Sequence, residues 1–245
     1  KVLDLINSNY SINKKKLKNK IYLIIPFAYE GGIEEGKIFF KKLLNHFYNN
    51  QKNISEYTCK IIFSLTKPEL AVLVKEKFPN ALIHERNLNN EYRLLGIHDF
   101  VHEIIIKYNI NEFDKILYCD LTYIFRPDGY LIDIISKGKK EKLPIISYFK
   151  ENRRAWTLTS NEAKELDKDF LPSSLKDSTI LISCLGIGSI INVKDINSGC
   201  IVGSEYILNP ISQKIASLQI KSYDELQFME KQFGKYSNHR PGKGL

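Results

Sequence analysis

The residues best suited to chemistry follow an apolar run that ends at Cys119. Asp120 comes directly after this run, and Thr122 and Arg126 follow closely. A carboxylate at the end of a strand can hold a metal ion that bridges two phosphates, and a guanidinium binds phosphate or carboxylate bidentately. We therefore expect a site for a phosphorylated ligand at residues 116–126, with Asp120 and Arg126 as candidate catalytic residues and Asp120 as a candidate Mg²⁺ ligand. A turn role for Asp120 and an ordinary surface position for Arg126 explain the same pattern.

A second candidate segment contains two adjacent glycines, Gly31 and Gly32, just before a predicted helix. Free backbone amides at the start of a helix suit phosphate oxygens. Three glutamates surround these glycines, namely Glu30, Glu34 and Glu35. Carboxylates repel phosphate unless a metal ion intervenes, so an ordinary turn is an equally good interpretation of the glycine pair.

The remaining reactive side chains form no readable catalytic triad. His98 and His102 are spaced to share one face of a predicted helix and could bind a metal, but no third ligand stands out. The four cysteines lie far apart without a Cys-x-x-Cys pair, which argues against a zinc site. Cys59 and Cys119 fall in apolar runs, which favours buried thiols in a reducing cytosol, and we therefore expect a cytoplasmic protein.

The composition bounds the possible partners. The chain has 245 residues, of which 43% are hydrophobic, so it can bury a sizeable core. Its net charge of +8 favours anionic partners such as nucleotides, although a lysine-rich solvated surface gives the same number. The charge leaves RNA binding open, but no basic motif interleaved with aromatic residues supports it, and no DNA partner is expected. No apolar run reaches the roughly 18 residues of a membrane span, and no signal peptide is apparent.

The elements that must position these residues alternate between strand and helix over the first 150 residues. Short apolar runs predict strands, and apolar residues at helical spacing predict helices. The predicted strands are 21–26, 60–64, 81–84, 114–119, 143–149, 186–193 and 214–220, and the predicted helices are 33–47, 68–78, 98–108, 130–136 and 222–233. Such alternation predicts right-handed βαβ units, and hence an α/β, Rossmann-like three-layer sandwich around a mostly parallel sheet.

We expect a single domain over residues 20–236. A lysine-rich arm or linker at 1–19 precedes it and a tail at 237–245 follows it. In open α/β sheets ligands bind beyond the carboxyl ends of the strands. The segments that should form the site are therefore the loops 27–37, 64–67 and 120–127 and whatever lies against 219–221.

Several segments resemble, in order along the chain, those of the acylneuraminate cytidylyltransferases, which make CMP-sugar acids from CTP. Residues 119–126 keep the threonine and the arginine of that family's Leu-Gln-Pro-Thr-Ser-Pro-x-Arg segment, and residues 185–191 and 217–226 are similar to its later strand and its closing segment. The resemblance covers about residues 20–234. It implies a nucleotide-diphospho-sugar transferase fold and a nucleotide or sugar acid as the small-molecule partner. The nucleotide- or substrate-binding residues that it implies are Gly31, Gly32, Lys37, Arg86, Thr122, Arg126 and Gly186.

This sequence also departs from that family's pattern. The family's phosphate loop reads Ala-Arg-Gly-Gly-Ser-Lys, whereas residues 27–33 lack both basic residues, and only Lys37 is near enough to substitute. The family's two metal-binding aspartates fall at Gln219 and Lys221, and a lysine repels Mg²⁺ instead of ligating it. Either the transfer of the nucleotide is weakened or lost, or the metal site has moved, with Asp120 taking over and Lys221 replacing a cation.

Three classes of function therefore remain open. The first is a cytidylyltransferase-like protein of surface-glycan (polysaccharide biosynthesis) or sugar-acid metabolism. The second is an A-type-fold glycosyltransferase, because residues 115–122 are similar to the Tyr-Leu-Asp-Ala-Asp segment of those enzymes, with Thr122 in place of the second aspartate. The third is a non-catalytic relative, or pseudoenzyme, that binds a nucleotide or sugar. Relatives of the first class often dimerise through a segment after the fifth strand, which makes 150–180 the candidate for a homodimer contact.

Overall fold

The computed structural model describes residues 19–29, 32–51, 53–86, 96–151, 156–158, 163–165 and 180–233. The predicted arm at 1–19, apart from its last residue, and the predicted tail at 237–245 lie outside this part of the chain, as does Gly31. Most of the candidate dimerisation segment at 150–180 lies outside it too, so both the domain limits and the dimer remain predictions.

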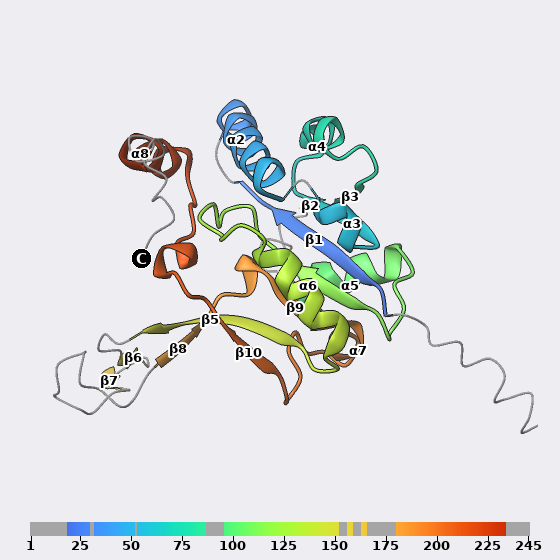
Figure 1. Cartoon of the computed structure of the whole chain (residues 1–245). Helices are drawn as coiled ribbons and strands as arrows, with labels where there is room; N and C mark the ends of the chain where they lie inside the picture. Colours follow the sequence, from blue (N-terminus) through green and yellow to red (C-terminus); the bar gives the residue numbers. More distant parts are fainter. Residues whose placement is uncertain are drawn as a thin grey trace, which may run out of the picture.

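The order of elements follows the predicted alternation (Figure 1). The strands are β1 (Ile21–Phe27), β2 (Lys60–Leu65), β3 (Leu82–Glu85), β4 (Lys115–Tyr118), β5 (Ile145–Glu151), β6 (Trp156–Leu158), β7 (Ala163–Glu165), β8 (Ile180–Ser183), β9 (Ser189–Asn192) and β10 (Ile207–Pro210). The α-helices are α2 (Ile33–Gln51), α3 (Ile54–Tyr57), α4 (Ala71–Lys77), α5 (Ile97–Lys107), α6 (Tyr130–Lys140), α7 (Val193–Asn197) and α8 (Tyr223–Phe233). Short 3₁₀ helices are η1 (Pro68–Leu70), η4 (Leu185–Ile187) and η5 (Lys214–Ser217).

The main sheet has the strand order β10-β5-β9-β4-β1-β2-β3, and β8 pairs with the far end of β5. Strands β4, β1, β2 and β3 run parallel to one another, and β10 runs parallel to β5. Strand β9 lies antiparallel between β4 and β5, and β8 is antiparallel to β5. Strands β6 and β7 pair separately as an antiparallel two-stranded ribbon. The prediction of an α/β fold with a mostly parallel sheet is confirmed.

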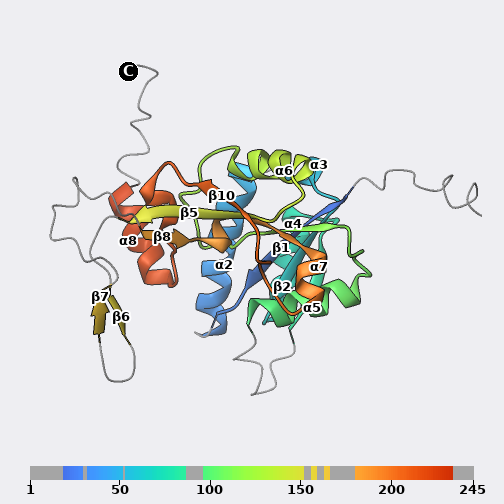
Figure 2. The same ribbon diagram turned by 90° about the horizontal axis from the view of Figure 1, so that it is seen from below.

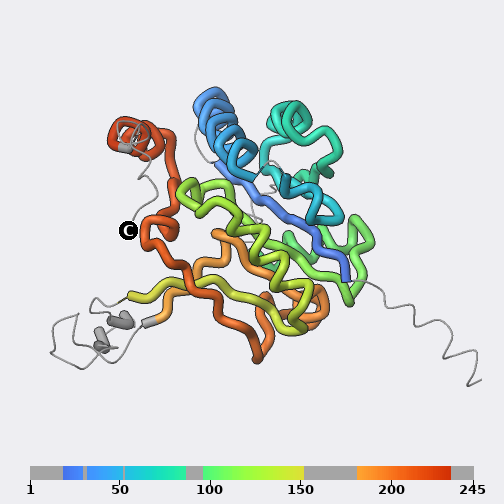
Figure 3. Tube along the Cα trace, viewed as in Figure 1, coloured from blue at the N-terminus to red at the C-terminus, as the bar shows by residue number. Residues whose placement is uncertain are grey.

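Helices cover both faces of this sheet, which gives three layers (Figure 2). Alternate residues of β1 point to opposite faces, as the two-residue period of a strand requires. Leu23 and Ile25 pack with α2, α4 and α6, whereas Ile24 packs with α5 and α7. The chain then returns, so that α8 lies beside α2 (Figure 3). Lys42 Nζ donates to Glu230 Oε2 at 2.6 Å between the two helices. Among the described residues, no helix is long and apolar enough to cross a membrane.

Two of the predicted strands differ from the structure. Residues 214–217 form the 3₁₀ helix η5, closed by local bonds such as that from Ala216 N to Gln213 O, so the strand predicted at 214–220 is wrong. The Gly-led strand predicted at 186–193 begins three residues later, at Ser189. The delay arises because Gly188 has a φ of 139°, a conformation that favours glycine and separates η4 from β9.

Candidate functional site

A cavity of about 370 Å³ lies beyond the carboxyl ends of the parallel strands. Residues from the ends of β1, β3 and β4, from α2 and α5, and from the segment before α8 line it. They are Pro26, Phe27, Ala28, Phe39, Arg86, Ile97, Phe100, Tyr118, Asp120, Thr122, Gln219 and Lys221. The structure therefore places Asp120, Thr122 and Arg86 together with Gln219 and Lys221, at the edge of the sheet where ligands of open α/β folds bind.

Asp120 is held in a tight turn at the wall of this cavity. Its Oδ1 accepts hydrogen bonds from Thr122 N at 2.9 Å and from Thr122 Oγ1 at 2.8 Å, and its Oδ2 lies 3.4 Å from Gln219 Nε2. Burial raises the pKa of Asp120, while the Thr122 hydrogen bonds oppose this rise. The hydroxyl of Thr122 therefore orients Asp120, and only Oδ2 retains room for a further partner.

Arg86 is the strongest anion-binding group in the cavity. Its Nη2 donates to Ser64 O at 3.1 Å, and its guanidinium carbon lies 4.9 Å from the centre of the Phe100 ring. Its Nε is buried and has no hydrogen-bond partner among the described residues. Burial lowers the pKa of Arg86. Because the guanidinium is partly desolvated and lines the cavity, an oxyanion there that accepts a hydrogen bond from it forms a charge-assisted contact, which is among the stronger hydrogen bonds in proteins.

Lys221 brings a second positive charge into the cavity. It belongs to the segment before α8, which is fixed by a hydrogen bond of 3.0 Å from Ile220 N to Thr122 O. Ile220 is buried, and its two neighbours, Gln219 and Lys221, line the cavity. The backbone amide of Lys221 donates to Glu225 Oε2 at 2.6 Å. The Lys221 ammonium has no carboxylate partner in the described part of the chain, so its charge is available to a ligand.

The cavity does not fit a protein-held Mg²⁺. Among its described lining residues Asp120 is the only carboxylate, and two cations, Arg86 and Lys221, share the same walls. Across the described ranges no group of three or more His, Cys, Asp or Glu side chains is arranged to hold a metal. Since Mg²⁺ seeks several oxygen ligands in a negatively charged setting, the donor set favours an anion instead.

Arg126 lies behind the cavity and not in its wall. Its Nε donates to Ile187 O, and its Nη2 donates to Asp120 O at 2.8 Å and Gly186 O at 3.2 Å. Only 7% of Arg126 is exposed, and its guanidinium carbon lies 5.9 Å from the centre of the Phe47 ring. These contacts make Arg126 a clamp on the backbone of the turn. The geometry therefore gives no support to the expectation that the Arg126 guanidinium binds a ligand bidentately.

Gly186 also supports the turn from behind. Its carbonyl accepts a hydrogen bond of 2.7 Å from Asp120 N. A Cβ atom at Gly186 would lie 2.7 Å from Tyr123 Cε2 and 3.0 Å from Asp120 Cβ. A glycine is therefore needed for close approach of the backbone, and Gly186 is not among the described residues that line the cavity.

The segment predicted to bind phosphate after β1 is not basic in the structure. Lys37 Nζ pairs with Glu34 Oε1 at 2.9 Å, and Gly32 is exposed. Tyr29 donates a hydrogen bond to Glu35. Neither Lys37 nor Gly32 lines the cavity, so the two cations that do line it come from other loops.

The histidine pair on α5 has a structural role. The rings of His98 and His102 stack with their centres 5.9 Å apart. His98 Nε2 lies 2.8 Å from Ile196 O and its Nδ1 lies 3.3 Å from Asp99 Oδ1. Both nitrogens of His98 are therefore engaged within the protein, which leaves the pair unsuited to holding a metal.

Sequence reasoning did not identify the apolar wall that α5 supplies to the cavity. Phe100 and Ile97 lie on α5, where helical spacing marks Phe100 simply as core, and Tyr118 ends β4. Burial raises the pKa of Tyr118 far above its ordinary value, so its hydroxyl stays protonated. Tyr118 is the last residue of β4 and therefore lies within residues 116–126, the segment expected to form the site.

Comparison with known proteins places this geometry in a structural class. No protein-family model and no curated protein matches the sequence. Among solved structures, 4-diphosphocytidyl-2C-methyl-D-erythritol synthase from Anaerococcus prevotii matches with a TM-score of 0.60 at 11% identity, covering 89% of this chain and 97% of that one. The 2-C-methyl-D-erythritol 4-phosphate cytidylyltransferase of Francisella tularensis matches with a TM-score of 0.57 at 14% identity, over 87% and 100% of the two chains. A CMP:2-keto-3-deoxy-manno-octonic acid synthetase solved with CTP matches with a TM-score of 0.57 at 9% identity, over 89% and 100%.

At these identities the comparisons show the fold. The chain has the fold of the nucleotide-diphospho-sugar transferases, in the form that cytidylyltransferases have. The comparisons therefore support the expected fold, but they do not single out the acylneuraminate cytidylyltransferases among the enzymes that have it.

Proposed function

We propose that the chain is a cytidylyltransferase-like protein whose cavity binds CTP or a cytidine nucleotide. The observation that carries the proposal is Arg86, a partly desolvated guanidinium at the wall of the cavity with no salt bridge to a carboxylate in the described part of the chain. Charge-assisted hydrogen bonds from guanidinium to phosphate are among the strongest in proteins. The position of the cavity, beyond the carboxyl ends of β1, β3 and β4, agrees with where this fold class places nucleotides.

In this proposal Arg86 and Lys221 neutralise the phosphates. Nucleotidyl transfer forms a bond between an acceptor oxygen and the α-phosphorus while the bond to the pyrophosphate leaving group breaks. Negative charge develops on the phosphate oxygens, and catalysis depends largely on positioning and on stabilising this charge. Two cations at the cavity wall supply part of that stabilisation, and the sugar-acid acceptor is inferred from the resemblance in the sequence.

A non-catalytic relative is the second candidate, and one observation favours it. Asp120, the sole carboxylate of the described cavity wall, has Oδ1 engaged by both donors of Thr122. Only Oδ2, which lies 3.4 Å from Gln219 Nε2, remains to accept a proton from an acceptor hydroxyl, so we expect transfer to be weak even when nucleotide binds. The contact with Thr122 also disfavours a glycosyltransferase. Thr122 stands where the Tyr-Leu-Asp-Ala-Asp segment of those enzymes has its second aspartate, and its hydroxyl donates a hydrogen bond to Asp120.

Isothermal titration calorimetry of the full chain tests this proposal with CTP, CMP and a UDP-sugar, each in Mg²⁺ and in EDTA. We expect CTP to bind selectively, and Arg86→Ala to weaken it at least tenfold. Lys41→Ala, an exposed lysine on α2, is the charge-matched control and should bind like the native chain. Silence toward all three nucleotides would exclude both enzyme classes. Selective binding of the UDP-sugar would favour glycosyl transfer instead.

A further inference from the structure

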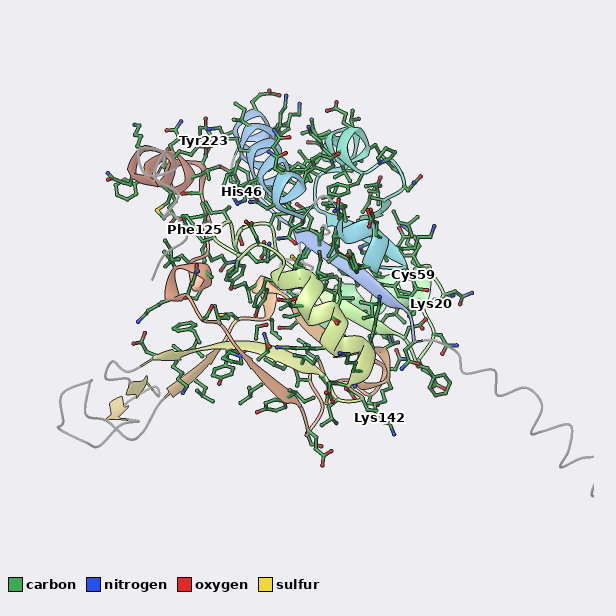
Figure 4. The ribbon with its side chains drawn as sticks, in the orientation of Figure 1. Lys20, His46, Cys59, Phe125, Lys142 and Tyr223 are labelled. Atoms are coloured by element: carbon green, nitrogen blue, oxygen red, sulfur yellow. The ribbon has the colours of Figure 1, made fainter. Side chains whose placement is uncertain are left out.

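A second hollow, larger than the first, lies at the opposite edge of the sheet. Its volume is about 410 Å³, and its walls include Lys60 at the start of β2 and Ala81 just before β3. Cys59, which also lines it, lies beside the start of β1, since its amide donates to Ile21 O at 2.7 Å. Figure 4 shows Cys59 near Lys20, at the end of the molecule away from Tyr223, where α8 begins. The hollow is therefore separate from the candidate nucleotide cavity.

The floor of this pocket is aromatic. The rings of Tyr48 and Phe78 meet edge to face with centres 5.4 Å apart, and Phe78 is buried against Phe63. Lys77 Nζ lies 5.4 Å from the centre of the Tyr48 ring. The two rings stand at 78° to each other, so they form an angled aromatic corner with an ammonium group beside it, which suits a ring that carries an anionic group.

The walls of the pocket are positively charged. Lys60 and Lys77 line it, and none of its described lining residues is an aspartate or a glutamate. Neither lysine has a carboxylate partner within the described ranges. The nearby Lys75 differs, because its ammonium donates to Pro79 O at 3.2 Å and Ala81 O at 2.7 Å and so fixes the rim. Two uncompensated cations in one concave site attract an anion.

We infer that this pocket binds a small phosphorylated molecule that contains a ring, such as a nucleoside monophosphate. Lys60 and Lys77 face its phosphate, Ser55 and Asn80 offer polar side chains at the rim, and the ring lies against the corner formed by Tyr48 and Phe78. The volume falls in the range usual for small-molecule sites. This inference is independent of the nucleotide cavity, because no described residue lines both sites.

The native chain offers a direct readout through its cysteines. Cys59 and Cys200 are exposed, whereas Cys119 and Cys184 are buried. We expect adenosine monophosphate to slow iodoacetamide alkylation of Cys59 several-fold and to leave Cys200 unchanged, as followed by mass spectrometry of the peptides. Adenosine and inorganic phosphate, added separately, should each protect far less. Equal alkylation of Cys59 with and without adenosine monophosphate would overturn the inference, as would equal slowing at Cys200.

Variants locate the binding. Lys60→Ala combined with Lys77→Ala should weaken adenosine monophosphate binding at least tenfold in calorimetry. The charge-matched pair Lys41→Ala with Lys140→Ala, both on exposed helix positions, should leave it unchanged. Arg86→Ala, at the other cavity, should also leave Cys59 protection intact. If Arg86→Ala abolishes that protection while the Lys60 and Lys77 variant retains it, the inferred pocket is wrong.

Discussion

The guanidinium of Arg126 donates a hydrogen bond of 2.8 Å to the backbone carbonyl of Asp120, on the side of the turn away from the cavity. The carboxylate of the same Asp120 forms part of the cavity wall. Arg126 therefore fixes the direction of Asp120 without facing a ligand. Its remaining bonds, to Ile187 and Gly186, tie this turn to the chain that precedes β9.

Arg126→Met should destabilise the fold more than it changes the site chemistry. The substitution removes donors to the carbonyls of Ile187, Asp120 and Gly186, of which Gly186 keeps its hydrogen bond from Asp120 N, and each buried carbonyl left unsatisfied costs on the order of 1–3 kcal/mol. We expect the free energy of unfolding, measured by urea denaturation, to fall by about 3 kcal/mol. Arg126→Lys should recover little, because an ammonium does not reproduce the fork of a guanidinium. Unchanged stability combined with lost CTP affinity would show instead that Arg126 contacts the nucleotide.

Lys221→Asp should make nucleotide binding depend on Mg²⁺. In the native chain Lys221 and Arg86 supply the positive charge of the cavity, so CTP affinity should change by less than about threefold between Mg²⁺ and EDTA. The substitution removes one cation and places a second carboxylate near Asp120, which gives Mg²⁺ two oxygen ligands. Calorimetry should then show weak binding in EDTA that Mg²⁺ restores at least tenfold. A native chain that binds only in Mg²⁺ would contradict this account.

His84 should make stability fall in mildly acidic solution. Burial, followed by the nearby charges of Lys107 and Arg86, lowers the pKa of His84 from 6.5 to about 4. Its Nδ1 lies 3.0 Å from Ser64 Oγ in the neutral form. Above pH 6.5 the histidine is neutral in the folded and unfolded states, so it adds no pH dependence. Between pH 6.5 and 4 only the unfolded state binds the proton, so the free energy of unfolding decreases as the pH falls.

The size of this effect is on the order of 3 kcal/mol, since the pKa falls from 6.5 to about 4 and one pKa unit corresponds to about 1.4 kcal/mol. Urea unfolding of the native chain and of His84→Gln at pH 7, 5.5 and 4.5 measures it. The difference between the two stabilities should shrink or reverse as the pH falls, because the variant lacks the titrating group. Parallel stability curves for the two proteins would rule out His84 as the source.

Much of the fold could be predicted because it depends on local patterns. Strand β1 shows as a short apolar run and helix α5 as apolar residues at helical spacing, and α8 begins where Ser222 Oγ accepts a hydrogen bond of 3.1 Å from Glu225 N, as the capping spacing suggests. Strands β8 and β10 gave no such signal. The expected strand at 214–220 failed because its apolar residues serve a 3₁₀ turn that packs against residues distant in sequence.

Part of the candidate site could likewise be predicted from the sequence, and part of it could not. The position of Asp120 at the end of β4 was readable, because strand ends in such sheets form binding sites. The partners of Arg126 could not be read, since Ile187 and Gly186 are about sixty residues away in sequence. Lys115 is a similar case, because it belongs to an apolar strand yet buries its ammonium against the carbonyls of Gly138 and Glu141, at the end of α6. Pairing of a charge with distant carbonyls leaves no local pattern.

Gln51 offers a prediction in the opposite direction, toward higher stability. It is the last residue of α2, only 3% of it is exposed, and neither its amide nitrogen nor its amide oxygen has a hydrogen-bond partner among the described residues. Gln51→Met keeps nearly the same shape and removes the cost of two buried polar atoms. We expect the free energy of unfolding to rise by about 1–2 kcal/mol in urea denaturation, whereas Gln51→Ala should lower it by leaving a cavity. Loss of stability in Gln51→Met as well would show that the amide is paired in solution. Comparing Gln51→Glu at low and at neutral pH would then identify the partner, because only a donor is satisfied by the ionised carboxylate.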